Sequence, residues 1–174
     1  MINKNGIDGL LESFKIALAL EREGKKLFRE AAEKTRSRLA RQTFEYLAAE
    51  EERHIERIEE FYNALSRSGG SDIPDTADST ADEKLETFNR MLEELKDTYQ
   101  STSSDIEAYK MALDFETSTE DFYEENLKEC QDAKIRKFYR WLIDEETMHS
   151  RLLRSCLRFV EDPAEWFRMR KKVL

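Results

Sequence analysis

The sequence predicts an all-α protein, a four-helix bundle made of two repeated antiparallel helical hairpins with a long crossover between them. Charged residues make up 39% of the 174 residues, which include only 5 glycines and 2 prolines, a composition that favours long helices. Apolar residues recur every three or four positions along four long stretches, as on the buried face of a helix. The second pair of stretches repeats the first with a displacement of 95 residues, from Glu21 to Glu116.

The first hairpin is predicted at about residues 8–66. Its first helix runs from about 8 to 34, and the turn that follows offers Ser37 as the N-cap of the second helix, which ends near Ser66. The apolar face of this second helix consists of Ala40, Phe44, Leu47, Glu51, His54, Ile58, Phe61 and Leu65. A carboxylate and an imidazole therefore fall on a face that should be buried, where unpaired polar groups are costly.

The crossover is predicted at about residues 67–103. The stretch at 66–80, SRSGGSDIPDTADST, is rich in Gly, Ser and Asp and predicts a loop. The stretch at 84–99, KLETFNRMLEELKDTY, predicts a helix of about four turns that lies across the connection.

The second hairpin is predicted at about residues 104–160. Its first helix should begin near Ser104, because Ser104 to Glu107 (SDIE) has the form of a capping box. Its second helix should begin near Asp132, a favourable N-cap. A short last helix at about 162–172 would have Asp162 as its cap and Pro163 at its first position. Residues 1–174 are thus predicted to form a single domain.

The repeat predicts a polar cluster in the core. The residues concerned are Glu21, Glu51, His54, Glu116, Glu146 and His149, and the chain has no other histidine. Glu21 and Glu51 each lie 15 residues from Arg36 in the first turn, so both should sit about 22 Å from it and face each other. In the second hairpin Glu116 and Glu146 likewise each lie 15 residues from Gln131, in the second turn. If the hairpins pair face to face, all six side chains meet at one level.

These residue types predict a binuclear metal site. Four buried carboxylates carry a charge of −4 that two divalent cations would neutralise, and both members of each Glu-x-x-His project from one helix face. Oxygen ligands with some imidazole suit iron, with manganese or a mixed-metal pair as alternatives, rather than structural zinc. One Glu from each of two helices plus Glu-x-x-His from each of the other two is the ligand set of carboxylate-bridged di-iron bundles. The alternatives are a bundle that keeps the pattern but has lost metal, and charge pairs on an exposed face.

Several classes of protein are disfavoured. The net charge of −9 argues against binding to nucleic acid, and no stretch approaches the ~20 apolar residues of a membrane span. Glu12 and Lys15 interrupt the N-terminal apolar run, which argues against a signal peptide, so we expect a cytoplasmic protein. Cys130 and Cys156 form no C-x-x-C, which excludes a zinc ribbon or rubredoxin-type iron site in this chain.

Taken together, these motifs resemble the rubrerythrin-like branch of the ferritin-like superfamily. The resemblance is carried by ALALEREGKKLF around Glu21, AAEEERH with Glu51 and His54, ALDFETSTEDFY around Glu116, and DEETMH with Glu146 and His149. It implies a ferritin-like bundle and a di-iron centre in which Glu51 and Glu146 bridge the two irons. Glu21 with His54 would complete one iron site, and Glu116 with His149 the other. It also implies a peroxidase or ferroxidase that oxidises Fe(II) with hydrogen peroxide or dioxygen.

The sequence departs from that family in two places. Rubrerythrins carry a rubredoxin-like domain with two C-x-x-C pairs, which this chain lacks, so we expect a separate electron-donor protein. They also have a glutamate three residues after the third-helix ligand, where this chain has Thr119. Glu120 is adjacent but lies about 100° further round the helix. A symmetric ferroxidase-like site with four Glu and two His is therefore the closer analogue.

Other functions stay open on the sequence alone. One is a non-catalytic metal-binding or partner-binding bundle, with the crossover helix and the segment containing Trp166 and Phe167 as its contact surface. Another is oxygenation of an organic substrate, which would need a pocket beside the metals. The resemblance implies a homodimer, and the two aromatic residues near the C-terminus are a second indication of one.

Overall fold

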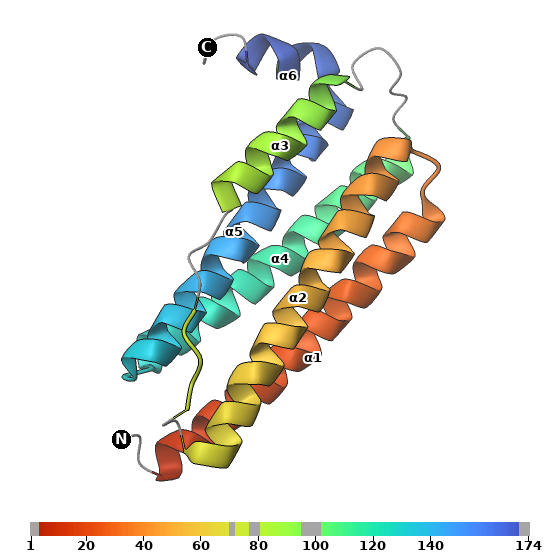
Figure 1. Cartoon of the computed structure of the whole chain (residues 1–174). Coiled ribbons are helices and arrows are strands. Elements are labelled where there is room, and N and C mark those ends of the chain that lie inside the picture. The colour runs from red at the N-terminus through yellow and green to blue at the C-terminus, as the bar shows by residue number, and fades with distance from the viewer. Residues whose placement is uncertain (1–3, 70–71, 77–80, 95–101, 171–174) are drawn as a thin grey trace.

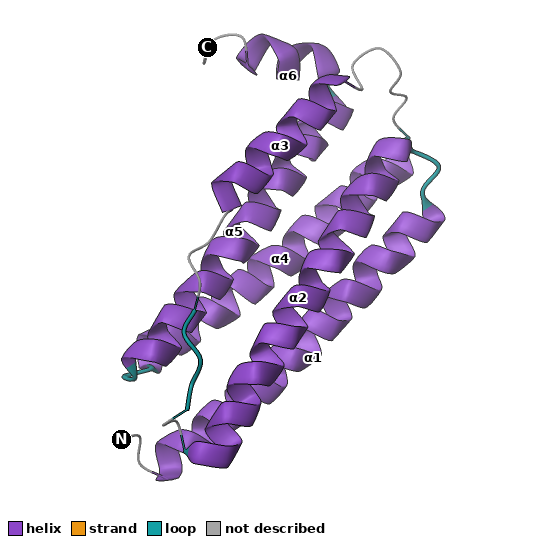
Figure 2. Cartoon of the chain, in the orientation of Figure 1, coloured by secondary structure: helices purple, strands orange, loops and turns teal. Residues whose placement is uncertain are grey.

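The four long helices that the sequence predicts are present in the computed structural model, which describes residues 4–69, 72–76, 81–94 and 102–170. In these residues there are six helices and no strand (Figure 2). The helices are α1 (Lys4–Lys34), α2 (Arg38–Ser68), α3 (Ala81–Glu94), α4 (Ser103–Glu129), α5 (Ala133–Glu161) and α6 (Pro163–Arg170). The predicted all-α bundle is confirmed.

Two antiparallel hairpins form the bundle. Helix α1 packs extensively along α2, and α4 packs extensively along α5 (Figure 1). The predicted N-caps at the two turns are confirmed: Ser37 accepts a hydrogen bond from the Ala40 amide, and Asp132 accepts from the amides of Lys134 and Ile135. These caps satisfy amides that would otherwise lack a partner at the start of each returning helix.

The apolar core is divided into two clusters along the bundle. One cluster includes Phe28, Phe44 and Leu153, and the other includes Phe14 and Phe61, all fully buried. The level between the two clusters on α1 and α2 carries the glutamates and histidine that the sequence placed on the apolar faces. The fold therefore brings the predicted site to the middle of the bundle.

The start of α4 differs from the prediction. The N-cap is Thr102, not Ser104, and the capping box pairs Thr102 with Asp105 instead of Ser104 with Glu107. Asp105 is buried and also accepts a hydrogen bond of 2.5 Å from the Thr35 hydroxyl, in the turn between α1 and α2. Two overlapping capping boxes are present in the sequence, and this contact between the hairpins favours the earlier one.

The crossover begins with α2 extended to Ser68 and ended by Gly69, whose φ of 60° is the left-handed conformation that glycine favours. Helix α3 begins at Ala81, earlier than predicted, and packs against α5 (Figure 1). Part of the predicted loop (70–71 and 77–80) and the last part of the predicted crossover helix (95–99) lie outside the described residues.

The last helix begins at Pro163, as predicted, and the Asp162 side chain accepts a hydrogen bond from the Glu165 amide. Trp166 is only 6% exposed because its ring packs against Phe159 and its indole N–H donates to the Ser155 hydroxyl. Trp166 therefore closes the end of its own chain's core. No helix among the described residues combines the length and apolarity needed to cross a bilayer.

Candidate metal centre

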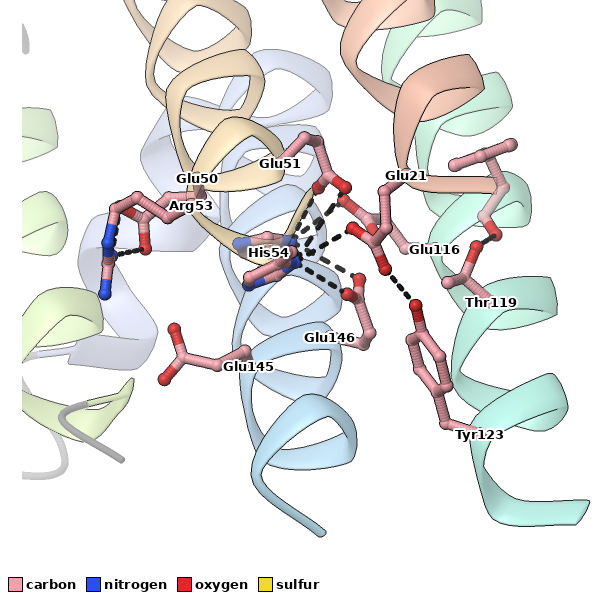
Figure 3. A network of polar contacts seen from close by, with 12 residues as sticks. Glu21, Glu50, Glu51, Arg53, His54, Glu116, Thr119, Tyr123, Glu145 and Glu146 are labelled. Atoms are coloured by element: carbon pink, nitrogen blue, oxygen red, sulfur yellow. Dashed lines mark hydrogen bonds and ion pairs between the residues drawn. The ribbon is translucent and has the colours of Figure 1, made fainter. Parts of the chain in front are cut away.

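The six predicted residues come together in the interior. Glu21 lies on α1, Glu116 on α4, and one Glu-x-x-His lies on each of α2 and α5 (Figure 3). The members are Glu21, Glu51, His54, Glu116, Glu146 and His149, and each is at most 1% exposed. We call this set the Glu/His cluster. The alternative that these charges lie on an exposed face is thereby excluded.

The Glu/His cluster consists of two overlapping groups of four residues. One group is Glu21, Glu51, His54 and Glu146, and the other is Glu51, Glu116, Glu146 and His149. Within each group one oxygen or nitrogen from every residue lies within 4.8 Å of the others. Glu51 and Glu146 belong to both groups, which is the division that the resemblance implies for two bridging and two terminal carboxylates.

The histidine rings direct their Nδ1 atoms toward the carboxylates. His54 Nδ1 lies 3.0 Å from Glu21, 3.1 Å from Glu146 and 3.9 Å from Glu51. The corresponding atom of His149 lies 3.2 Å from Glu116, 3.3 Å from Glu51 and 3.5 Å from Glu146. A ring nitrogen carries at most one proton, so it cannot donate a good hydrogen bond to three carboxylates at once.

Burial and mutual repulsion perturb the ionisation of the cluster. Burial, followed by the neighbouring carboxylates, raises the pKa of Glu51 and Glu116 well above the usual value. Burial alone would lower the pKa of His54, but Glu21 and Glu146 outweigh it and raise the pKa to about 9. Burial would likewise raise the pKa of Glu146, but the adjacent Glu116 and both histidines outweigh it and hold this pKa well below the usual value. Without a cation, the cluster must therefore retain protons.

Many polar atoms of the cluster have no hydrogen-bond partner among the described residues. They are Glu51 Oε1, both carboxylate oxygens of Glu116 and of Glu146, His54 Nε2, and both ring nitrogens of His149. Unsatisfied buried polar atoms are rare in folded proteins and each costs about 1–3 kcal/mol. Carboxylate oxygens and imidazole nitrogens at this density fit two divalent cations, which would bind the carboxylate oxygens and the Nδ1 atoms and neutralise the four carboxylates.

Two aromatic side chains hold residues of the cluster in place. The Tyr123 hydroxyl donates a hydrogen bond to Glu21 (Figure 3), and the Trp141 ring packs edge-on against His54 with the ring centroids 5.5 Å apart. The sequence analysis did not find either role. Tyr123 of the second hairpin corresponds to Phe28 of the first. The presence of a hydroxyl in only one half of the repeat was the sequence signal that could have indicated a polar role for Tyr123.

A second buried ionic group lies on the other side of α2 and α5. Lys84 of α3 donates to Glu50 and, at 2.6 Å, to Glu145, and Glu50 also accepts from Arg53 (Figure 3). Glu50 is 6% exposed and Glu145 is 1% exposed. The sequence analysis missed this group as well, although Glu50 and Glu145 are equivalent in the repeat and each directly precedes a cluster glutamate.

The two halves of the site carry different residues one helical turn after Glu21 and Glu116. Lys25 forms an ion pair with Glu52, whereas its repeat equivalent Glu120 accepts a hydrogen bond of 2.7 Å from the Thr147 hydroxyl. Thr119 is 2% exposed and donates to the Phe115 carbonyl at 3.2 Å, so it does not replace the missing glutamate. Its repeat equivalent is Gly24.

Comparison with curated proteins and with solved structures gave no significant match to this chain. A sequence model of the Rubrerythrin family, however, matches residues 12–157. This span contains most of both hairpins and all six residues of the Glu/His cluster. The fold, the buried cluster and this match agree, and the chain belongs to the rubrerythrin family.

Proposed function

We propose that this protein is a non-haem di-iron oxidoreductase that oxidises Fe(II) with hydrogen peroxide or dioxygen, in peroxide detoxification or iron handling. The observation that carries the proposal is the convergence of six buried side chains from four helices, many of whose polar atoms lack a hydrogen-bond partner among the described residues. Such a set needs cations, and its oxygen-rich chemistry suits iron.

In this proposal Glu21 and His54 hold one ion, Glu116 and His149 hold the other, and Glu51 and Glu146 contact both. Two ferrous ions would supply the two electrons that, with two protons, reduce hydrogen peroxide to two molecules of water. The bound ions would lie in the interior of the bundle, because every ligand is buried between the two apolar clusters.

The surrounding residues position the ligands and exclude water. The Tyr123 hydroxyl orients the Glu21 carboxylate, and burial, followed by the charge of Glu21, raises the pKa of Tyr123 well above the usual value. Tyr123 therefore keeps its proton at the phenol oxygen. The Trp141 ring fixes the plane of His54. Loss of such a contact to a metal ligand commonly lowers metal affinity about 10- to 100-fold.

The electrons that return the site to its reduced state would come from a separate protein. Cys130 and Cys156 are both buried and unpaired with each other, so the two cysteines offer no site for a further iron centre. The proposal therefore includes an external electron-donor protein and, from the family resemblance, assembly as a homodimer.

The test is anaerobic titration of the metal-free protein with Fe(II), followed by addition of hydrogen peroxide or dioxygen. We expect about two irons per chain and rapid oxidation monitored by ultraviolet–visible absorption. The Glu51→Ala and Glu146→Ala variants should lose both binding and oxidation, whereas Glu56→Ala, at an exposed position of α2, should keep both. Stoichiometric binding without oxidation would contradict the enzymatic proposal and favour a non-catalytic metal-binding bundle.

A further inference from the structure

A groove of about 450 Å³ runs along the surface between α1 and α4. Leu27, Ala31, Ala108 and Met111 form its apolar part, and charged side chains such as Glu23 and Lys26 stand beside them. Met111 is 60% exposed, which is unusual for a large apolar side chain. On α1 the groove begins at Glu23, which directly precedes Gly24, and on α4 it reaches Met111, one turn from Phe115.

At this end of the groove Gly24 and Phe115 face each other beside the Glu/His cluster. A Cβ atom placed on Gly24 would lie 2.7 Å from Phe115 Cε1 and 3.4 Å from Glu51 Oε2. The Phe115 ring thus occupies space that only a glycine at position 24 leaves free. The same space borders the buried Glu51 carboxylate. Phe115 is partly exposed while Glu51 is 1% exposed, so the ring reaches from the space beside the carboxylate to solvent.

Several side chains cover the cluster on the side formed by α2 and α5. Both imidazole rings come from α2 and α5, and Trp141 covers His54 on that side. Lys84, Glu50 and Glu145 bridge α3 to α2 and α5 beyond them. The interfaces within each hairpin are extensively packed. At the seam between α1 and α4, the partly exposed Phe115 lies beside the cluster and one turn from the surface groove.

We propose that Phe115 controls the access of small neutral oxidants to the Glu/His cluster from the α1–α4 groove, with Gly24 providing the space that its ring occupies. This inference rests on the proposed function. The apolar lining favours neutral molecules, and the cluster carboxylates repel anions. Rotation of one ring admits a molecule the size of hydrogen peroxide, whereas a branched hydroperoxide needs the ring to be absent.

The test compares Phe115→Ala and Phe115→Leu with Phe122→Ala in the iron-loaded protein. Phe122 is the matched control because it is a partly exposed phenylalanine of α4 one heptad further along the same face. We expect Phe115→Ala to raise the rate of tert-butyl hydroperoxide reduction about tenfold relative to hydrogen peroxide, Phe115→Leu to raise it less, and Phe122→Ala to leave the ratio unchanged.

A second measurement does not depend on oxidation. The cobalt(II)-loaded proteins are mixed with imidazole at pH 8, where imidazole is neutral, and its association is followed by the cobalt absorption bands. We expect association with Phe115→Ala to be about tenfold faster than with wild type or Phe122→Ala. Equal rates in all three proteins would overturn the role of Phe115. A wild type that binds cobalt but does not oxidise Fe(II) would contradict the proposed function, and the imidazole rates would still decide the access route.

Discussion

At the scale of single residues, Tyr123 makes the two halves of the site unequal. Its hydroxyl donates to Glu21, while the repeat-equivalent Phe28 has no such group. Because Phe28 packs well at the equivalent position, Tyr123→Phe should fold normally and lose only the hydrogen bond. We expect metal affinity at the Glu21–His54 half to fall about tenfold, measured by calorimetric titration with Mn(II) or Co(II).

Tyr139→Phe is the control for this prediction. The Tyr139 hydroxyl makes its hydrogen bond with Ser13 at 2.9 Å, away from the Glu/His cluster. Its removal should leave both metal affinities unchanged. An equal loss of affinity in the two variants would mean that the Tyr123 hydroxyl has no special role.

The two cysteines should be unreactive in the folded protein. Cys156 is fully buried, and burial raises the pKa of its thiol to about 12; burial also raises the pKa of Cys130. Because the thiolate is the reactive form, neither residue should react with Ellman's reagent within minutes at pH 7.5, whereas both should react in guanidinium chloride. Rapid stoichiometric labelling of the native protein would contradict this burial.

At the scale of elements, α3 is held by a partly buried lysine. Lys84 contacts Glu145, which is 1% exposed, and Glu50. Lys84→Met should reduce the free energy of unfolding by about 3 kcal/mol, since it removes the ammonium group that joins α3 to two buried carboxylates. Urea denaturation measures this value. Lys25→Met removes an ion pair with the half-exposed Glu52 and should cost less than about 1 kcal/mol. Similar losses in the two variants would contradict a special role for the buried pair.

Helix positions follow from local sequence, whereas some helix ends do not. The periodic apolar residues, together with Ser37 and Asp132, predicted the hairpins because caps and periodicity act within one helix. The start of α4 was predicted two residues late, because the contact of Asp105 with Thr35 joins segments 70 residues apart. The packing of Trp166 onto Phe159 is also a tertiary contact, which residue type alone cannot distinguish from an exposed patch.

At the scale of the whole molecule, the metal-free bundle should lose stability as pH rises. The pKa of His54 is raised from 6.5 to about 9, so its contribution is fully present below pH 6.5 and disappears as pH passes through about 9. The raised pKa values of Glu51 and Glu116 act in the same direction. The melting temperature of the metal-free protein should fall between pH 6 and pH 9, measured by scanning calorimetry.

The metal-loaded protein is the comparison for this pH dependence. Divalent ions take the place of the cluster protons, so the melting temperature should be higher and nearly constant over the same range. A metal-free protein whose melting temperature rises with pH would contradict the assigned directions of the His54 and glutamate pKa values.

The cluster itself was predictable, whereas its surroundings were not. The repeat and the two Glu-x-x-His motifs placed all six residues at one level, because helix rise and periodicity are fixed by backbone geometry. The contact of Phe115 with Gly24 and the ion pair of Lys84 with Glu145 depend on how the two hairpins and α3 pack together. Periodicity within one helix does not specify that packing.

The unequal neighbours of Glu21 and Glu116 have a consequence for the order in which cations enter. Near Glu21 the positive Lys25 is balanced by Glu52, while near Glu116 the negative Glu120 meets only a hydroxyl in its described hydrogen bond. In the proposed binuclear site we therefore expect the His149 side to attract the first cation. Metal titration should then show stepwise binding, in which a species with one bound ion precedes the species with two.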